Sequence, residues 1–73
     1  MVSVTACYED NDCRTFSHIT KISYNGYDEV IEVSEEKLIT HSFPIGVPLW
    51  LYSDNGVAVI HGSGLRCVVI VKE

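Results

Sequence analysis

The sequence predicts an all-β fold, a small barrel or sandwich of six to seven short antiparallel strands built from hairpins. Two observations support this prediction. Apolar residues alternate with polar ones or run in short blocks, and no segment shows the periodicity of an amphipathic helix. The dipeptides Asn25-Gly26 and Asn55-Gly56 each separate two such segments, which is the pattern of a tight β-hairpin.

Residues 1–73 are expected to form a single β domain, because no linker or low-complexity segment divides the chain. A domain of this size buries only about 60% of the surface that its unfolded chain exposes. Hydrophobic residues nevertheless make up 47% of the sequence. We therefore expect another chain to cover part of the apolar surface, and we predict a homo-oligomer.

The chain begins with a predicted strand over 2–7, in which valine and alanine alternate with polar residues, and an acidic loop over 8–14 follows. Cys7 and Cys13 stand at the two ends of this loop, and Cys67 lies near the C-terminus. An odd number of cysteines without a secretory signal favours a reducing compartment, so we expect ordinary thiols and a cytoplasmic location. A Cys7–Cys13 disulfide across the loop is the alternative, and it requires an oxidising setting.

The first predicted hairpin pairs segment 15–24 with segment 27–33. A two-residue turn at Asn25-Gly26 would place Tyr24 opposite Tyr27. One face of this hairpin is mainly apolar and the other mainly polar, which is usual for an antiparallel sheet with one side in water.

The second half of the chain is predicted to add a short strand over 37–42, a hairpin over 49–61 and a final strand over 65–72. With Asn55 and Gly56 at the centre of the turn, Trp50 would lie opposite His61. Both faces of this hairpin are apolar, and the block 68–71 is apolar throughout. These two elements are therefore expected to be covered on both sides.

The segment 43–48 is the predicted partner-binding loop. It contains two prolines, which do not fit inside a sheet, yet it carries the apolar residues Phe43, Ile45 and Val47. A loop that faces solvent is normally polar. These side chains either fold over an open end of the domain or dock on another chain.

A candidate ligand-binding group consists of Trp50, Tyr52, His61 and Arg66. The first three share one predicted face of the second hairpin, and Arg66 follows the next turn. Aromatic rings beside an arginine can stack on a planar, anionic ligand such as a nucleotide. The same residue types are favoured at the centres of protein interfaces and in cores, so three interpretations stay open.

The charge of the chain argues against two classes of partner. The net charge is −5, and the five basic residues are scattered along the sequence. Direct binding of nucleic acid needs a basic patch that meets the phosphates, and an anionic membrane surface also attracts clustered basic residues. No segment approaches the length of a membrane span, so we expect neither nucleic acid nor membrane as a partner.

No constellation in the sequence predicts an enzyme. His18, His41 and His61 could ligate zinc only if the fold brought them together, and no close pair of histidines or CxxC spacing supports a metal site. No nucleophile motif is present. We therefore predict no catalytic residue, no metal and no cofactor.

The run 26–30 and the later run 56–65 resemble the rhythm of turns, strands and glycines in the β-rich YabP/YqfC-like sporulation proteins. The resemblance implies a β meander and carries no function with it.

These observations predict a non-catalytic protein-interaction module. It would be a homo-oligomeric phage or bacterial regulator or inhibitor that binds another protein. One alternative is a protein that binds or sequesters a small anionic, nucleotide-type ligand between subunits. A structural assembly protein is the other alternative.

Overall fold

The computed structural model describes residues 1–44 and 46–73. Strands account for most of this part of the chain. They are β1 (Val2–Tyr8), β2 (Cys13–Ile19), β3 (Lys21–Asn25), β4 (Val30–Ser34), β5 (Leu49–Ser53), β6 (Gly56–Ile60) and β7 (Leu65–Lys72). One turn of 3₁₀ helix, η1 (Glu35–Lys37), follows β4.

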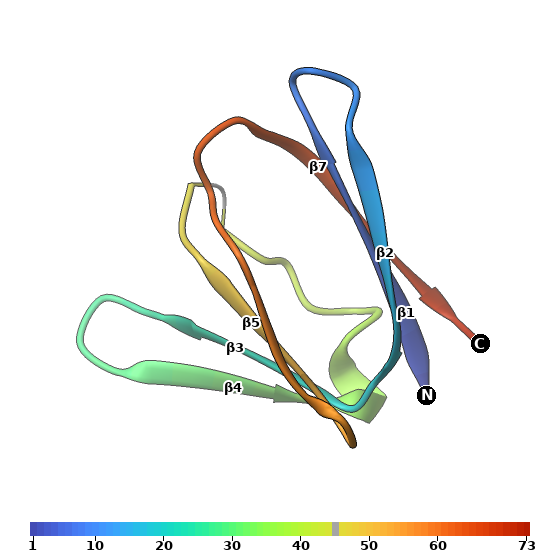
Figure 1. Cartoon of the computed structure of the whole chain (residues 1–73). Helices are drawn as coiled ribbons and strands as arrows, with labels where there is room; N and C mark the ends of the chain where they lie inside the picture. The colour runs from blue at the N-terminus through green and yellow to red at the C-terminus, as the bar shows by residue number, and fades with distance from the viewer. Residues whose placement is uncertain (45) are drawn as a thin grey trace.

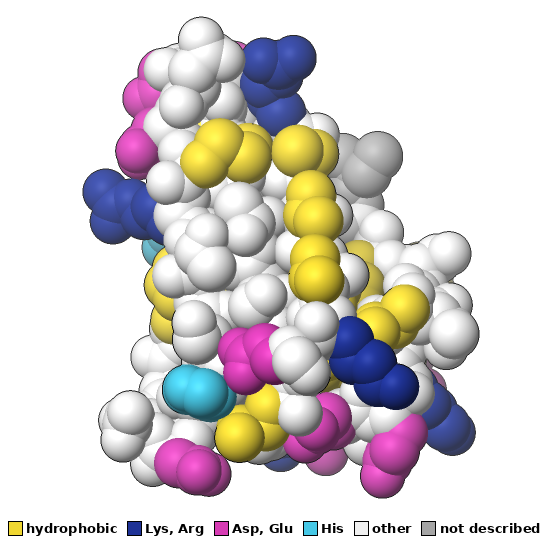
Figure 2. Space-filling view, turned by 90° about the vertical axis from the view of Figure 1, so that its right-hand side faces the viewer, with side chains coloured by type: hydrophobic (Ala, Val, Ile, Leu, Met, Phe, Trp, Pro, Cys, Tyr) yellow, Lys and Arg dark blue, Asp and Glu magenta, His cyan; other side chains and the backbone are white. Residues whose placement is uncertain are grey.

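The strands form two antiparallel sheets, which confirms the predicted all-β fold. One sheet has the order β2-β1-β7 and the other has the order β4-β3-β5-β6. Figure 1 shows the three-stranded sheet on the right and the four-stranded sheet on the left. Figure 2 views the molecule from the side of the three-stranded sheet. The two sheets do not close into a barrel.

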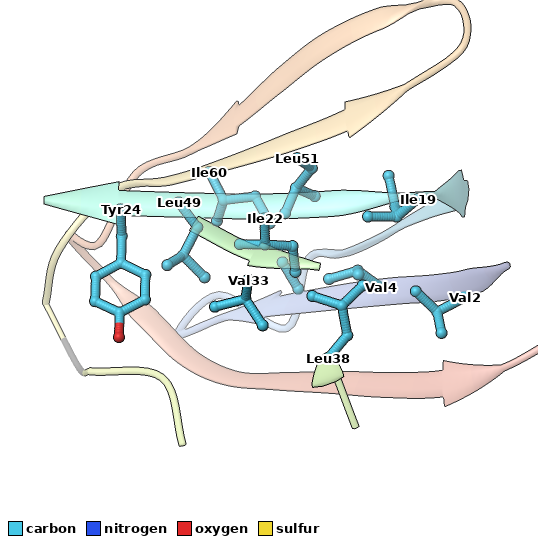
Figure 3. Close-up of a cluster of buried hydrophobic side chains, with 11 residues drawn as sticks. Val2, Val4, Ile19, Ile22, Tyr24, Val33, Leu38, Leu49, Leu51 and Ile60 are labelled. Carbon is cyan, nitrogen blue, oxygen red and sulfur yellow. The ribbon is translucent and has the colours of Figure 1, made fainter. Parts of the chain in front are cut away.

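The hydrophobic core lies between the two sheets (Figure 3). β1 contributes its inward-facing residues Val2, Val4 and Ala6, as the alternation along this strand predicts. The end of β2 and the four-stranded sheet supply most of the other core residues. These are Ile19, Ile22, Tyr24, Val33, Leu49, Leu51 and Ile60. Leu38 enters the core from the connection between η1 and β5.

The predicted single strand over 15–24 is wrong, because the strand is interrupted at Thr20, where the chain passes from one sheet to the other. β2 ends in the three-stranded sheet and β3 begins in the four-stranded one. His18 has a φ of 60°, and the β1–β2 pairing shifts register between Val2 and Val4. Such an irregularity bends a strand, and the Thr20 N–H bonds to the Tyr52 carbonyl at the crossing.

The first hairpin has a longer turn than the sequence predicts. Tyr24 lies opposite Ile31 and not opposite Tyr27. The Gly26 N–H donates to the Glu29 carbonyl at 2.7 Å, which closes a wider loop and leaves Tyr27 fully exposed at its tip. The change of partner spans an even number of residues, so the predicted inner and outer faces of this hairpin are kept.

The second hairpin is also shifted. Ser53 pairs with Gly56, so Asp54 and Asn55 form the turn in place of Asn55 and Gly56. Gly56 has a φ of +142°, a conformation that side chains disfavour, and this explains why the glycine follows the turn. Trp50 lies opposite Val59 as a result, and not opposite His61.

The prediction that the second hairpin and the final strand are covered on both sides is wrong. β6 and β7 are edge strands, and Val57, Val59, Val69 and Val71 are exposed. The two sheets cover only each other's inner faces, so their outer faces stay open to solvent. Part of the apolar content of the chain therefore lies on these outer faces.

The predicted strand over 37–42 is also wrong, because η1 and a turn occupy this segment. The Lys37 carbonyl accepts bonds from the His41 N–H at 3.1 Å and from the Thr40 hydroxyl at 3.3 Å. This curl points Leu38 inward, where it is 0% exposed, while its neighbour Ile39 is 50% exposed. The connection after η1 therefore contributes Leu38 to the core between the two sheets.

Candidate functional site

The outer face of the four-stranded sheet carries both large aromatic residues of β5. Leu49 and Leu51 face the core and are fully buried, so Trp50 and Tyr52 project from the opposite side of the strand. Both are half-buried. We call the surface around them the aromatic face, which consists of Lys21, Ser23, Val30, Glu32, Trp50, Tyr52, Val57 and Val59.

The strand register places a polar residue on one side of each ring and a valine on the other. Trp50 is flanked by Ser23 on β3 and by Val59 on β6, and Tyr52 is flanked by Lys21 and Val57. Val57 is 52% exposed and Val59 is 41% exposed. Val30, on the edge strand β4, is 62% exposed. Apolar side chains therefore cover the β5–β6 side of the face, and polar residues of β3 separate them from Val30 at the other edge.

Two polar contacts hold Tyr52 in place on this face, and an ion pair positions the lysine that makes one of them. The ammonium of Lys21 lies 4.4 Å from the centre of the Tyr52 ring, within the range of a cation–π contact. The same ammonium is 3.1 Å from a carboxylate oxygen of Glu32. Ser23, the one buried polar residue in the described chain, donates its hydroxyl to the Tyr52 hydroxyl at 3.5 Å. The Tyr52 ring is thus held in place before any partner binds.

The aromatic face carries no net charge, although the chain as a whole is acidic. Lys21 and Glu32 are its only charged residues, and they neutralise each other. This pair is largely exposed, so we expect it to add little to the stability of the fold. Most of the acidic residues lie outside the strands. They are Glu9, Asp10, Asp12, Asp28, Glu29, Glu35, Glu36, Asp54 and Glu73.

The structure does not bring the predicted ligand-binding group together. Trp50 and Tyr52 share the aromatic face, but Arg66 belongs to the other sheet. Its guanidinium lies 3.5 Å from the amide oxygen of Asn11, in the β1–β2 loop. His61 is exposed beyond the end of β6. The cause is the strand order, which separates β7 from β5.

Two residues of the predicted partner-binding loop pack onto the protein's own core. Phe43 and Val47 both contact the buried cluster and are half-buried. Ile45, the third predicted residue, lies outside the described residues. The ring of Phe43 is 4.7 Å from His41 and 5.7 Å from Tyr24, and the Tyr24 hydroxyl bonds to His41 Nε2 at 2.7 Å. These contacts anchor the loop to the domain.

The Tyr24–His41 hydrogen bond gives a direct test of this anchor. Replacing Tyr24 by phenylalanine removes the hydroxyl and should lower the free energy of unfolding by about 1 kcal/mol, because His41 loses its partner. Urea denaturation followed by fluorescence measures the change. Tyr27→Phe is the matched control, since Tyr27 is 100% exposed. Equal stability of the two variants would show that the bond does not anchor the loop.

The three histidines lie in separate places. His18 contacts Glu73, with 3.1 Å between Nδ1 and a carboxylate oxygen, whereas His41 bonds to Tyr24. Among residues 1–44 and 46–73, no group of three histidine, cysteine or acidic side chains has a geometry suited to a metal ion. In the same residues, no helix has the length and apolar character needed to cross a membrane.

No protein-family model, curated protein or solved structure matches the chain. The resemblance to sporulation proteins therefore has no support from a family match.

The sequence did not predict how the three cysteines are arranged in the fold. Cys7 and Cys13 form a disulfide between β1 and β2, which is the alternative and not the expected pair of thiols. Cys67 is a free, exposed thiol on β7. The spacing of Cys7 and Cys13 around a short loop indicated that they could meet. Nothing local indicated that Cys67 would lie beside them.

Proposed function

We propose that the protein is a non-catalytic protein-interaction module, built as a small two-sheet sandwich, that acts as a homo-oligomer. The open aromatic face is the observation that carries this proposal. Trp50 and Tyr52 lie at its centre, and the exposed Val57 and Val59 lie beside them on β6. Tryptophan and tyrosine are enriched at the energetic centres of interfaces, and an uncovered apolar surface of this kind usually marks a binding site.

The distribution of charge favours a second copy of the chain as the occupant. Two chains of net charge −5 repel each other unless they meet where the acidic groups are absent. The aromatic face meets this condition, because Lys21 and Glu32 cancel. In a two-fold arrangement the same face serves both copies, so each Lys21 can also approach Glu32 of the other copy.

The size of the face sets the expected affinity. Four strands about 4.8 Å apart and about five residues long span roughly 19 by 17 Å. This projected area of roughly 320 Å² is well below the about 800 Å² per partner that standard interfaces bury, so association through it should be weak and readily reversible. We therefore expect a reversible dimer with a dissociation constant on the order of micromolar.

Sedimentation equilibrium over a concentration series tests the proposal. The wild-type chain should change from monomer to dimer as the concentration passes through the micromolar range. Val59→Glu places a new carboxylate on each copy directly beside Trp50, so it should raise the dissociation constant at least about tenfold. Val71→Glu is the matched control, because it adds the same charge at an exposed strand valine of the other sheet.

Two outcomes would contradict the proposal. If the wild-type chain stays monomeric at several hundred micromolar, the proposed self-association is wrong. If Val71→Glu dissociates the dimer and Val59→Glu does not, the contact lies on the three-stranded sheet and not on the aromatic face. Circular dichroism of both variants establishes that they remain folded.

We further propose that this oligomer is a cytoplasmic regulator or inhibitor, of phage or bacterial origin, that binds another protein. Acidic turns around an apolar face would steer it toward a basic surface and speed association. Disulfides in the cytoplasm are usually transient and serve redox sensing or catalysis. A cytoplasmic location would thus require the Cys7–Cys13 bridge to form and break there.

A further inference from the structure

All three cysteines of the chain lie in one row across the outer face of the three-stranded sheet. β1 is the central strand of this sheet, so Cys7 has a cross-strand neighbour on each side. It pairs with Cys13 on β2 and with Cys67 on β7. The adjacent residue Ala6 faces the core, and therefore Cys7 and its two partners face outward.

The same three residues also line one hollow in the surface. This cavity of about 360 Å³ is bordered by Cys7, Cys13 and Cys67 together with Tyr8, Asn11 and Arg66. Directly opposite residues of an antiparallel pair have Cβ atoms about 4.5–5.5 Å apart. Small movements of the strands bring such a pair to the Cβ separation of a disulfide, about 3.5–4.5 Å. Cys7 can therefore be bridged to either neighbour.

The local backbone gives β7 room for such a movement. The pairing of β1 with β7 shifts register between Cys7 and Tyr8, since Tyr8 lies opposite Leu65 and leaves Arg66 as an extra residue. Bulges of this kind re-aim side chains at sheet edges, and β7 is an edge strand. In the part of the chain that the structure describes, no further strand pairs with β7 on its outer side.

From this arrangement we infer that Cys13, Cys7 and Cys67 form a thiol–disulfide exchange site in which the bridge moves between β2 and β7. The thiol of Cys67 loses its proton to solvent, and the thiolate attacks the sulfur of Cys7. A Cys7–Cys67 bond forms as the Cys7–Cys13 bond breaks, and Cys13 leaves as a thiolate that takes up a proton. The number of disulfides stays at one, so no outside oxidant or reductant is needed.

The row also determines which sulfur is attacked. Exchange proceeds when the attacking sulfur approaches opposite the leaving sulfur, and three side chains in a line across a sheet provide this geometry. Cys13 lies two strands from Cys67, about 9.6 Å away at the usual strand spacing, which is too far for direct attack. Cys7 is therefore the shared partner, and Cys13 and Cys67 alternate as the free thiol.

Moving the bridge changes which parts of the chain are tied together. The Cys7–Cys13 bridge spans a sequence separation of 6 and constrains only the first hairpin. A Cys7–Cys67 bridge would link the two ends of the chain and restrain the unfolded state more strongly. The exchange also moves the exposed thiol from β7 to the start of β2, beside the acidic β1–β2 loop, where a different partner can reach it.

Peptide mapping tests the exchange. The protein is kept at neutral pH, free thiols are alkylated with N-ethylmaleimide, and the denatured chain is digested with trypsin. Cleavage after Arg14 and Arg66 leaves Cys7 and Cys13 in peptide 1–14 and Cys67 in peptide 67–72. A Cys7–Cys13 bridge stays within one peptide, whereas a Cys7–Cys67 bridge joins the two.

The wild-type protein should yield both products, with the alkyl group on Cys67 in the first and on Cys13 in the second. Cys67→Ser should reduce alkylation of Cys13 by at least about tenfold, because the attacking thiol is absent. The ratio of the two products should not change over a wide range of protein concentration, since the exchange is intramolecular. Cys13 that is never alkylated, or joined peptides that increase with concentration, would overturn the inference.

Two single variants test the geometry without depending on the position of the equilibrium. Cys13→Ser, treated with oxidised glutathione, should form the Cys7–Cys67 bridge within one chain. Cys7→Ser is the matched control, because its remaining cysteines are two strands apart and should give only mixed disulfides with glutathione. The inference fails if Cys13→Ser forms only mixed or intermolecular disulfides, or if Cys7→Ser forms an internal bridge as readily.

Discussion

Replacing Leu38 by alanine should lower the free energy of unfolding by about 2–5 kcal/mol. The side chain is 0% exposed and lies between the two sheets (Figure 3), so its removal leaves a cavity that the strands on either side cannot fill. A small domain has a total stability of about 5–15 kcal/mol, and one of this length is expected near the lower end. Urea denaturation monitored by circular dichroism measures the loss.

Ile39→Ala is the control for this prediction. Ile39 is adjacent in the sequence and similar in size, but it is 50% exposed, and we expect a change within about 0.5 kcal/mol. If both substitutions lowered the free energy of unfolding equally, Leu38 would not be a core residue. The packing described for Leu38 would then be wrong.

Removing the Cys7–Cys13 disulfide should cost about 2 kcal/mol, the chain-entropy value for a bridge that closes so short a loop. The comparison is best made between Cys67→Ser and the triple variant Cys7→Ser/Cys13→Ser/Cys67→Ser, since neither can exchange disulfides. Denaturation in urea gives the difference. Cys67→Ser in a strong reductant should match the triple variant.

The single variant Cys67→Ser should itself be about as stable as the wild-type chain, because Cys67 is exposed and makes no bridge in the structure. A triple variant as stable as Cys67→Ser would show that the disulfide contributes nothing to folding. In that case its role would lie in the chemistry of the three-cysteine row alone.

The aromatic face and the row of three cysteines lie on opposite sides of the molecule. The aromatic face belongs to the four-stranded sheet, and the cysteine row belongs to the three-stranded sheet. Each sheet uses its inner side for the core, so the outer sides remain free for different tasks. A change in the bridge therefore need not block association through Trp50 and Tyr52.

Local sequence determined the strands and their faces. Alternation of apolar and polar residues predicted that Val2, Val4 and Ala6 point the same way, and all three are buried. Both predicted hairpins exist, although their turns are wrong by a few residues. Because the shifts in register are even, the paired side chains of β3 to β6 stay on the predicted faces.

Tertiary structure decided the rest, because contacts between distant segments have no local signature. The break at Thr20 follows from the passage between two sheets, and the burial of Leu38 follows from the space between them. The strand order separates Arg66 from Trp50 and places Cys67 beside Cys7. A period of two in the sequence fixes the side of a strand on which a residue lies, but only packing of the whole chain selects the neighbouring strand.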